Sequence, residues 1–438
     1  MFKQGDKPWG NICERVDTCA LTGAAAFIAG IPGAEILVNG PLWCYFYALR
    51  HLEHSDYRMA ERMHGSQPDN TAVVYGAEKY ILETLARLQK QGLQPELLFI
   101  ESSCSMSLIG DDLNGIANKA QLPFSFVAMD CGGLVGGFAE GYTKAALAVL
   151  DKFLCKNDVP NEHMVNILGQ TDFYLQGRDD TTELQRLLHK AGYQVQAVPG
   201  GGATLEQLKH LGRAQLNIVT NEELGLPLAQ YLEQQLGTPY VLAGLPYGVQ
   251  GTKAWLEIIA NALPAPALAD VLAEADAAQE YLTSCLNDAR CQWGALWFDR
   301  VIVSAPPTQA LCLAQALRRE WVDTQSLTVC CQRQLPQSVP STYCNEADAI
   351  YMAGQDSFAW NTLANDEGSL LLLGSSSESS LLYRLGLKNF VSCNIAYPAN
   401  EEIFLTEQPQ VGLEGSKQLL QKIWNAYIRQ CLQKQGEA

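Results

Sequence analysis

The sequence predicts an α/β protein built from three Rossmann-like domains with parallel sheets. Short apolar runs alternate with longer amphipathic segments along the whole chain, which is the order of elements in parallel α/β proteins. The length of 438 residues exceeds what one hydrophobic core normally holds, so two or three domains are expected. A polar linker at 155–163 and an Ala/Pro run at 262–270 divide the pattern, which recurs three times without an exact sequence repeat.

The first predicted domain covers residues 1–158 and contains a motif that ends in a cysteine. Four apolar residues at 97–100 predict a short buried strand, and the chain then turns polar and small up to Cys104. We expect a loop after Cys104 and a helix opened by Gly110, Asp111 and Asp112, because carboxylates suit a helix N-terminus. The other elements expected here are a small-residue helix at 22–31, a strand at 35–40, an aromatic-rich helix after it, an amphipathic helix at 76–92, a strand at 124–130 and a helix through 141–154.

The second and third predicted domains cover residues 159–265 and 266–438. Each repeats apolar strands separated by amphipathic helices, and the third ends in a C-terminal helix. The strands expected are 164–170, 193–199 and 214–221, followed by 239–244, and then RVIVSAP, SLTVCC, DAIYMAG, SLLLLG and NFVSC in the third domain.

Composition excludes several classes of function. The formal net charge of −17 argues against nucleic acid or an anionic membrane as the main partner. No apolar run is long enough to span a bilayer, and the first residues lack the pattern of a signal peptide, so a cytoplasmic protein is expected. The chain contains no Walker A motif and no G-x-G-x-x-G after a strand, and its glycine clusters at 132–137 and 200–202 are read as turns.

Three of the fourteen cysteines stand apart from the others. No zinc-type C-x2-C pairs and no dense disulfide framework occur, and cysteines such as Cys312 sit inside apolar patterns typical of a core. Cys19, Cys44 and Cys104 each fall at a loop or a helix start in the first domain. Helix N-termini favour thiolates, and thiolates on converging loops are the ligands of iron–sulfur clusters. Three ligands leave a cubane one short, and the alternative of buried cysteines without metal stays open.

The cysteine motifs resemble those of a known family. CALTGA around Cys19, GPLWCYFY around Cys44 and SSCSMSLIGDD around Cys104 are similar, in order and spacing, to the three P-cluster motifs of nitrogenase component 1 subunits. The resemblance continues nearly to the end of the chain, through the segments at 69–81, 126–142, 245–252 and 394–425. It implies three Rossmann-like domains around a metal cluster.

The departures from the family pattern indicate which kind of subunit this is. The catalytic nitrogenase subunit holds its iron–molybdenum cofactor with a cysteine of the second domain and a histidine of the third. Here Asn221 or a neighbour stands in the first position, and the third domain has no histidine, while LPYGVQGT resembles the β-type chains. The resemblance therefore implies a β-type chain in which Cys19, Cys44 and Cys104 hold a P-cluster-like eight-iron or a [4Fe–4S] cluster at a subunit interface.

The implied function is that of a subunit of a nitrogenase-like reductase. Such a subunit would relay low-potential electrons from an ATP-hydrolysing iron protein to a substrate site in an α-type partner, within an α2β2 hetero-oligomer or a homodimer. Dinitrogen, a tetrapyrrole and a small carbon–sulfur compound are the substrates that the family suggests. The alternative is a scaffold on which the nitrogenase iron–molybdenum cofactor is assembled.

Several nearby residues have weaker claims to a role. Cys131 lies near where the nitrogenase β subunit places a serine that contacts the P-cluster, and Cys13 lies six residues before Cys19. Each is a candidate extra ligand, with a core or silent thiol as the favoured interpretation. Loop shaping is expected of Gly40, Pro41 and Gly110, helix-start positions of Asp111 and Asp112, and surface positions of His51, His54 and His64.

Overall fold

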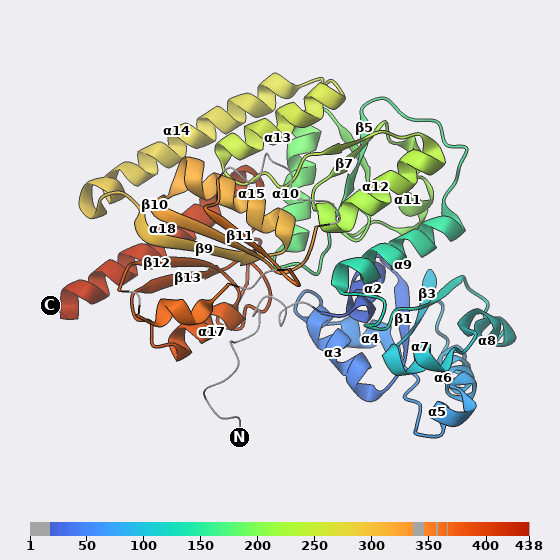
Figure 1. Cartoon of the computed structure of the whole chain (residues 1–438). Helices are drawn as coiled ribbons and strands as arrows, with labels where there is room; N and C mark the ends of the chain where they lie inside the picture. Colours follow the sequence, from blue (N-terminus) through green and yellow to red (C-terminus); the bar gives the residue numbers. More distant parts are fainter. Residues whose placement is uncertain (1–17, 336–345, 356–357, 366, 438) are drawn as a thin grey trace.

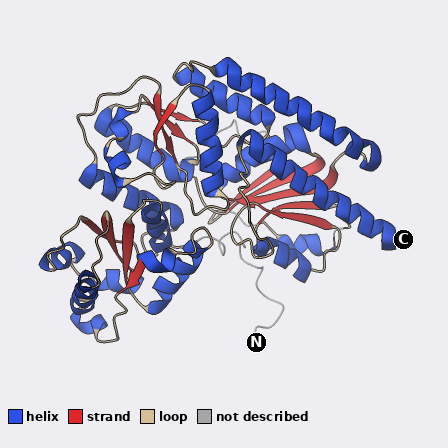
Figure 2. Ribbon diagram, turned by 180° about the vertical axis from the view of Figure 1, so that it is seen from behind, coloured by secondary structure: helices blue, strands red, loops and turns tan. Residues whose placement is uncertain are grey.

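The computed structural model describes residues 18–335, 346–355, 358–365 and 367–437. These residues form three parallel β-sheets, each flanked by helices on both faces (Figures 1 and 2). The strands of each sheet come from one continuous part of the chain. This arrangement confirms the predicted fold class.

The first sheet has the strand order β2-β1-β3-β4, and all of its pairs are parallel. Helices α2, α3 and α9 pack on the face that carries Leu97 and Phe99, whereas α6 and α8 pack on the face that carries Leu98 and Ile100. The bounds are β1 Ala34–Asn39, β2 Met63–Gly65, β3 Leu97–Ser102, β4 Phe126–Asp130, α2 Ala20–Ala29, α3 Leu42–Glu53, α4 Met59–Arg62, α5 Ala72–Tyr75, α6 Glu78–Lys90, α7 Cys104–Ile109, α8 Leu113–Lys119 and α9 Phe138–Phe153.

The second sheet repeats the same order as β6-β5-β7-β8. It contributes to two hydrophobic cores. Helix α12 on one face of this sheet packs against α9 of the first part of the chain, and the other face of the sheet shares a core with the third sheet. The bounds are β5 Met164–Leu168, β6 Gln194–Ala197, β7 Leu216–Val219, β8 Tyr240–Leu242, α10 Gly177–Lys190, α11 Leu205–Lys209, η1 Leu211–Arg213, α12 Glu222–Leu236 and α13 Val249–Ala262.

The third sheet has five strands in the order β11-β10-β9-β12-β13. The long helix α14 packs against α13, α10 and α18 (Figure 1). Helix α18 also contacts β13, α10 and α13, and so connects the third part of the chain to the second. The bounds are β9 Trp297–Ala305, β10 Asp323–Cys331, β11 Ala349–Met352, β12 Leu370–Gly374, β13 Phe390–Asn394, α14 Leu268–Trp293, α15 Pro307–Ala316, η2 Leu317–Trp321, η3 Trp360–Asn365, α17 Ser376–Arg384 and α18 Gly412–Glu437.

The crossing of α2 and α9 positions the start of both helices. Every residue of α2 is buried, and a β-carbon added to Gly23 would lie 1.9 Å from the carbonyl oxygen of Phe138. A β-carbon on Gly141 of α9 would lie 1.8 Å from the carbonyl oxygen of Ala20. The two backbones therefore approach so closely that only glycine fits at either contact. This contact places the N-terminal ends of α2 and α9 side by side.

In the described part of the chain, none of the helices combines the length and the apolar character needed to cross a bilayer.

Candidate metal centre

Three cysteines lie at the start of three helices in the first part of the chain. Cys19 is the N-cap residue of α2, Cys44 is the third residue of α3, and Cys104 is the first residue of α7. The positive ends of these helix dipoles favour the thiolate form of a nearby cysteine. The sequence predicted helix starts or loops at all three positions.

The sheet topology brings two of these helix starts together. Strands β1 and β3 are neighbours at the centre of the sheet, while β2 and β4 lie on opposite sides of this pair. The chain therefore leaves the carboxyl ends of β1 and β3 in different directions, which is where open α/β sheets form their ligand crevice. Cys44 follows β1 and Cys104 follows β3 directly across this point.

Hydrogen bonds fix the carboxyl ends of these strands. The side chain of Asn39 donates to Ser102 Oγ across 3.1 Å and accepts from Ser66 Oγ across 2.8 Å. The backbone N–H of Ser103 donates to the carbonyl oxygen of Asn39 at 2.9 Å. Because Asn39 and Ser102 are completely or almost completely buried, this network holds the two strand ends that precede Cys44 and Cys104 in a fixed register.

The loop after β4 joins Cys104 to Cys19. The backbone N–H of Gly133 donates to Cys104 Sγ across 2.9 Å. A β-carbon on Gly133 would lie 3.3 Å from Cys19 Cβ and 3.5 Å from Cys104 Sγ. Further along the loop, Gly137 forms an isolated antiparallel bridge with Cys19. Cys19 and Cys104 therefore both lie against one glycine, and Cys44 is close enough to both thiols to interact with them electrostatically.

The electrostatics of the three thiols favour a bound cation. Burial raises the pKa of Cys44, the nearby thiols Cys104 and Cys19 raise it further, and a hydrogen bond with Ser103 lowers it. Among the described residues, no positively charged side chain is a cause of this shift. Three thiolates at one place repel one another unless a metal compensates their charge, so the donor set fits a group that carries several positive ions.

The three cysteines are donors of the kind that iron–sulfur clusters use. Across the described residues, no three His, Cys, Asp or Glu side chains are gathered tightly enough to bind one ion together. An iron–sulfur cluster makes a different demand, because each thiolate binds its own iron atom and the ligands stand apart. Soft thiolates, helix N-termini and a backbone N–H aimed at a sulfur atom all suit such a cluster.

Two further groups lie beside the three thiols. The thiol of Cys131 is fully buried, and burial, followed by the charge of Glu101, raises its pKa well above the usual value. Glu101 itself is fully buried near the end of β3, and neither carboxylate oxygen has a hydrogen-bond partner. Cys13, the other candidate extra ligand, lies outside the described residues. The sequence showed Glu101 only as a polar residue ending an apolar strand, so its burial could not be read there.

The loop-shaping residues occupy the expected positions, with one change of structure. Pro41 is the N-cap of α3, and Asp112 caps α8 by accepting the N–H of Gly115 at 2.9 Å. Asp111 accepts the N–H of Ala77 at 2.7 Å. The expectation of a loop between Cys104 and Gly110 was wrong, because the short helix α7 fills this interval and ends at Gly110 in the left-handed conformation.

Of the histidines near these motifs, His54 is exposed as expected, whereas His51 and His64 are only partly exposed. His51 was expected at the surface, but its ring packs against Phe138 and Tyr397, with centroid distances of 5.8 and 6.3 Å. Burial, together with the positive charge of Arg333, lowers the pKa of His51 to about 3. His64 is also only partly exposed and lies 2.8 Å from a carboxylate oxygen of Glu35. The ring of His54 stacks on Tyr397, with a centroid distance of 5.1 Å.

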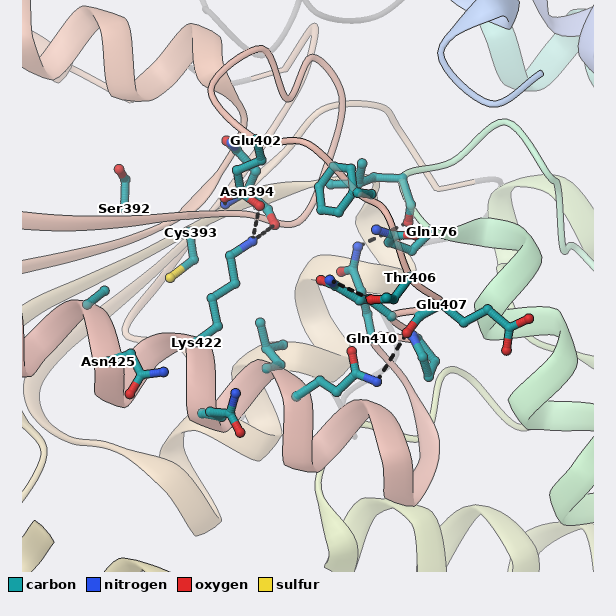
Figure 3. Close-up of a pocket in the computed structure, with 18 of the residues that line it drawn as sticks. Gln176, Ser392, Cys393, Asn394, Glu402, Thr406, Glu407, Gln410, Lys422 and Asn425 are labelled. Atoms are coloured by element: carbon teal, nitrogen blue, oxygen red, sulfur yellow. Dashed lines mark hydrogen bonds and ion pairs between the residues drawn. The ribbon is translucent and has the colours of Figure 1, made fainter. Parts of the chain in front are cut away.

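A cavity of about 300 Å³ is lined by Gly137, the bridge partner of Cys19, and others lie farther from the three cysteines. A polar cavity of about 580 Å³ lies between β13 and α18, where Lys422 bonds to Glu402 and to the carbonyl oxygen of Asn394 (Figure 3). A much smaller cavity of about 20 Å³ lies where the three parts of the chain meet, beside His51, Tyr174 and Arg333. The guanidinium of Arg333 fills this junction by lying over the ring of Phe138, 4.3 Å from its centroid.

Comparisons with known proteins identify the family. The family model "Nitrogenase component 1 type Oxidoreductase" matches residues 19–428. Curated relatives include a subunit of the light-independent protochlorophyllide reductase from Synechococcus sp., 25% identical over 413 residues that span 84% of this chain and 75% of the relative. The corresponding chain from Zygnema circumcarinatum is 24% identical, over 82% of this chain and 72% of the relative.

A solved structure shares the fold over nearly the whole length of both chains. The structure of nitrogenase Cp1 at pH 6.5 matches with a TM-score of 0.77 and 16% sequence identity, covering 98% of this chain and 95% of the other. The family match spans more than nine tenths of the sequence and includes Cys19, Cys44 and Cys104. The chain therefore belongs to the nitrogenase component 1 type oxidoreductases, as a subunit of that family.

Proposed function

We propose that this chain is the cluster-carrying, β-type subunit of a nitrogenase-like reductase complex. Cys19, Cys44 and Cys104 would hold an iron–sulfur cluster, which supplies stepwise acceptance and release of single electrons. The observation that carries the proposal is the convergence of these cysteines at three helix starts, with Cys19 and Cys104 against Gly133 and Cys44 within electrostatic reach of both. The names of the curated relatives, each one subunit of a reductase, support a role within a complex of several different chains.

Each chain element has a defined part in this proposal. The helices α2, α3 and α7 direct their N-terminal ends at the three cysteines, and the positive ends of helix dipoles stabilise a thiolate. The Gly133 N–H directs a hydrogen bond at Cys104 Sγ, which fixes the orientation of that side chain. The buried network of Asn39, Ser66 and Ser102 keeps the ligand-bearing strand ends rigid. Cys131 stays a candidate extra contact, although its side chain belongs to the hydrophobic core under α2.

An exposed apolar surface supports a partner subunit at this site. The elements that carry Cys44 and Cys104, and the loop that contacts them, expose large apolar side chains: Leu42, Trp43, Phe46 and Tyr47 on α3, Leu108 on α7, and Leu134 beside Gly133. Exposed apolar surface of this kind marks an interaction site. We infer that an α-type chain covers it, as in an α2β2 hetero-oligomer, with a homodimer as the alternative.

Electron supply and substrate reduction would occur in other chains. The sequence has no Walker A motif, so a separate ATP-hydrolysing iron protein is the proposed electron donor. At the junction between the three parts of this chain, Arg333 lies over the ring of Phe138, with a cavity of about 20 Å³ beside it. Two larger cavities adjoin this junction, one of about 320 Å³ lined by residues that include Asp172 and Tyr397, and one of about 300 Å³ beside Gly137 and Arg333. The scaffold function therefore stays the alternative to the reductase.

The test is anaerobic purification of the chain alone and of the chain co-expressed with its genomic neighbours. Iron, acid-labile sulfide and the electron paramagnetic resonance spectrum are measured for both. The proposal predicts a cluster that stays bound through turnover, and iron found only with a partner chain would support a site at the interface. A cluster that is released to an acceptor protein would favour the scaffold function. Iron-free protein under both conditions would overturn the proposal.

A further inference from the structure

The polar cavity between β13 and α18 has no part in the proposed function (Figure 3). Its volume of about 580 Å³ lies within the range of about 300–1,000 Å³ that is usual for small-molecule sites. One wall is the end of β13, the edge strand of the third sheet, and a second wall is one face of α18. The loop 402–410 and the residues before α10 complete the lining. The cavity therefore lies where the second and third parts of the chain meet.

Hydrogen bonds within the chain hold the loop 402–410 in place. Gln410 Nε2 donates to the carbonyl oxygens of Leu175 and Ile395 across 3.0 and 3.2 Å. The backbone N–H of Gln410 donates to Asp180 Oδ1 across 2.6 Å. A ligand that enters the cavity thus meets walls that are already ordered, and this lowers the entropic cost of binding.

One face of α18 lines the cavity with polar side chains. Gln421, Asn425 and Arg429 follow one another at intervals of four residues, so they lie along the same face of the helix. All three are exposed, and none of them forms a side-chain hydrogen bond or an ion pair with another described residue. Their hydrogen-bonding groups are therefore available to a bound molecule.

The charged side chains around the cavity leave Arg429 as an available cation. Lys422 forms an ion pair with Glu402, so these two charges compensate each other (Figure 3). Glu407 also lines the cavity, but in Figure 3 its side chain extends away from Lys422 and Asn425. The α18 side of the cavity is thus the side that favours an anion.

The cysteine in the cavity wall adds no negative charge. Burial raises the pKa of the Cys393 thiol to about 12, while the charges of Lys422 and Arg429 act in the opposite direction. The thiol is therefore neutral at physiological pH. The effect of Arg429 on this thiol also shows that the guanidinium is within electrostatic reach of the β13 wall.

These groups together select one kind of ligand. A guanidinium recognises a phosphate or a carboxylate through paired N–H groups. Amide side chains carry both donors and acceptors, which matches hydroxyl groups, since these also donate and accept. Phe404 adds an apolar surface to the same cavity, suited to the C–H face of a sugar ring. An anion that carries several hydroxyl groups satisfies all of these features.

We propose that this cavity binds a small polyhydroxylated anion of the sugar phosphate class. Arg429 binds the anionic group, and the amides of Gln421 and Asn425 bind hydroxyl groups. Because the walls come from the second and third parts of the chain, the bound molecule connects these parts and stabilises their arrangement. The site is separate from the proposed function, since none of Cys19, Cys44 and Cys104 lines the cavity.

The test is isothermal titration calorimetry on the full-length chain, purified together with any partner chains. Glucose 6-phosphate and gluconate combine hydroxyl groups with a phosphate or a carboxylate, whereas glucose lacks the anionic group and inorganic phosphate lacks the hydroxyl groups. Glucose 6-phosphate or gluconate should bind at least tenfold more tightly than both glucose and inorganic phosphate, and the tighter of the two identifies the anionic group. Absence of binding by both would overturn the proposal, as would inorganic phosphate that binds as tightly as either.

Two variants locate the binding in this cavity. Arg429→Gln should weaken binding of the tighter probe about tenfold or more, because a charge-assisted pair is lost. Asn425→Ala should weaken it severalfold. Arg384→Gln is the matched control, since Arg384 is an exposed arginine on α17 that does not line the cavity, and it should bind as the wild type does.

Thermal unfolding without the probe separates lost binding from a lost fold. Arg429 and Asn425 are exposed, so the variants should melt as the wild type does. An affinity unchanged in Arg429→Gln, or reduced equally in Arg384→Gln, would overturn the proposal. Iron content should be the same in all of these proteins, so the result stands apart from that of the test for the cluster.

Discussion

The backbone N–H of Gly133 donates a hydrogen bond to the sulfur atom of Cys104 across 2.9 Å. The two residues come from different strands of the first sheet: Cys104 follows β3, and Gly133 lies in the loop after β4. The same glycine lies against Cys19, so one loop connects two of the candidate ligands. The site is therefore built by the edge of the sheet and does not depend on a single sequence motif.

Replacing Cys44 should remove the metal without unfolding the protein. Cys44→Ala deletes one of three thiolates, and the side chain is only partly buried, so we expect most or all of the iron to be lost at nearly unchanged stability. Iron per chain and circular dichroism of the anaerobically purified complex are the measurements. Cys312→Ala is the matched control. Cys312 lies on α15 and is buried in the hydrophobic core, so the variant protein should keep its iron. Unchanged iron in Cys44→Ala would exclude the residue as a ligand.

Gly132 should be sensitive to the smallest enlargement. A β-carbon at this position would lie 2.7 Å from Cys104 Cα and 2.8 Å from its backbone nitrogen, closer than atoms approach without a shift of the backbone. Gly132→Ala should therefore displace the loop or the start of α7 and lower iron retention severalfold, measured as iron per chain after gel filtration. Gly251→Ala, at a helical position with no atom within 4 Å of the added carbon, should retain full iron. Equal iron in both variants would show that the loop does not hold the site in shape.

Among the described residues, the sequence predicted each strand except the short β2, Met63–Gly65, but it did not predict the packing around the site. Residues 97–100 and 370–373 are continuous apolar runs because parallel strands are covered on both faces, and this pattern is visible without a structure. The burial of Glu101 depends on α2 and α9, which lie far from it in the sequence. The same holds for His51, whose neighbours are Phe138, Arg333 and Tyr397. Such environments come from tertiary contacts, so local patterns do not reveal them.

The three helix starts show where local and tertiary information meet. Residue type and position identified Cys19, Cys44 and Cys104 as candidates, because each falls at a predicted loop or helix start of the first domain. Their convergence required the strand order β2-β1-β3-β4 and the close crossing of α2 with α9. The short helix α7 was missed because its six residues, CSMSLI, are too few to show a helical period.

The apolar surface of α3 should determine binding of the partner chain. Trp43 and Tyr47 are each 65% exposed and stack on each other at a centroid distance of 6.0 Å. Trp43→Ser should leave the fold of this chain intact, because the side chain has few internal contacts to lose, and should lower co-purification of the α-type partner at least tenfold. Tyr383→Ser is the control, since Tyr383 is 67% exposed on α17 in the third part of the chain. Equal loss in both variants would argue against a partner at α3.

The stability of the protein should fall in acid through His51. Its pKa is lowered from 6.5 to about 3 by burial and by the charges of Arg333 and His54, so the folded state binds the proton later than the unfolded state does. The contribution of the neutral ring to stability is therefore complete above pH 6.5 and is lost as the pH falls from 6.5 toward 3. At pH 5 the expected loss is about 2 kcal/mol relative to neutral pH.

His51→Phe isolates this contribution, because a phenyl ring keeps the aromatic contacts with Phe138 and Tyr397 but does not titrate. Chemical denaturation of the iron-free chain at pH 7.5 and 5 (about one unit either side of an ordinary histidine pKa) gives the free energy of unfolding for both proteins. The variant should lose less stability than the wild type between the two pH values, with the difference near the same 2 kcal/mol (an order of magnitude). His189→Phe is the control, since His189 lies in the last turn of α10, far from this junction, and should leave the wild-type pH dependence in place. If His51→Phe and wild type lose the same stability in acid, the proton that weakens the fold binds elsewhere, and the three-part junction is not the acid-sensitive element.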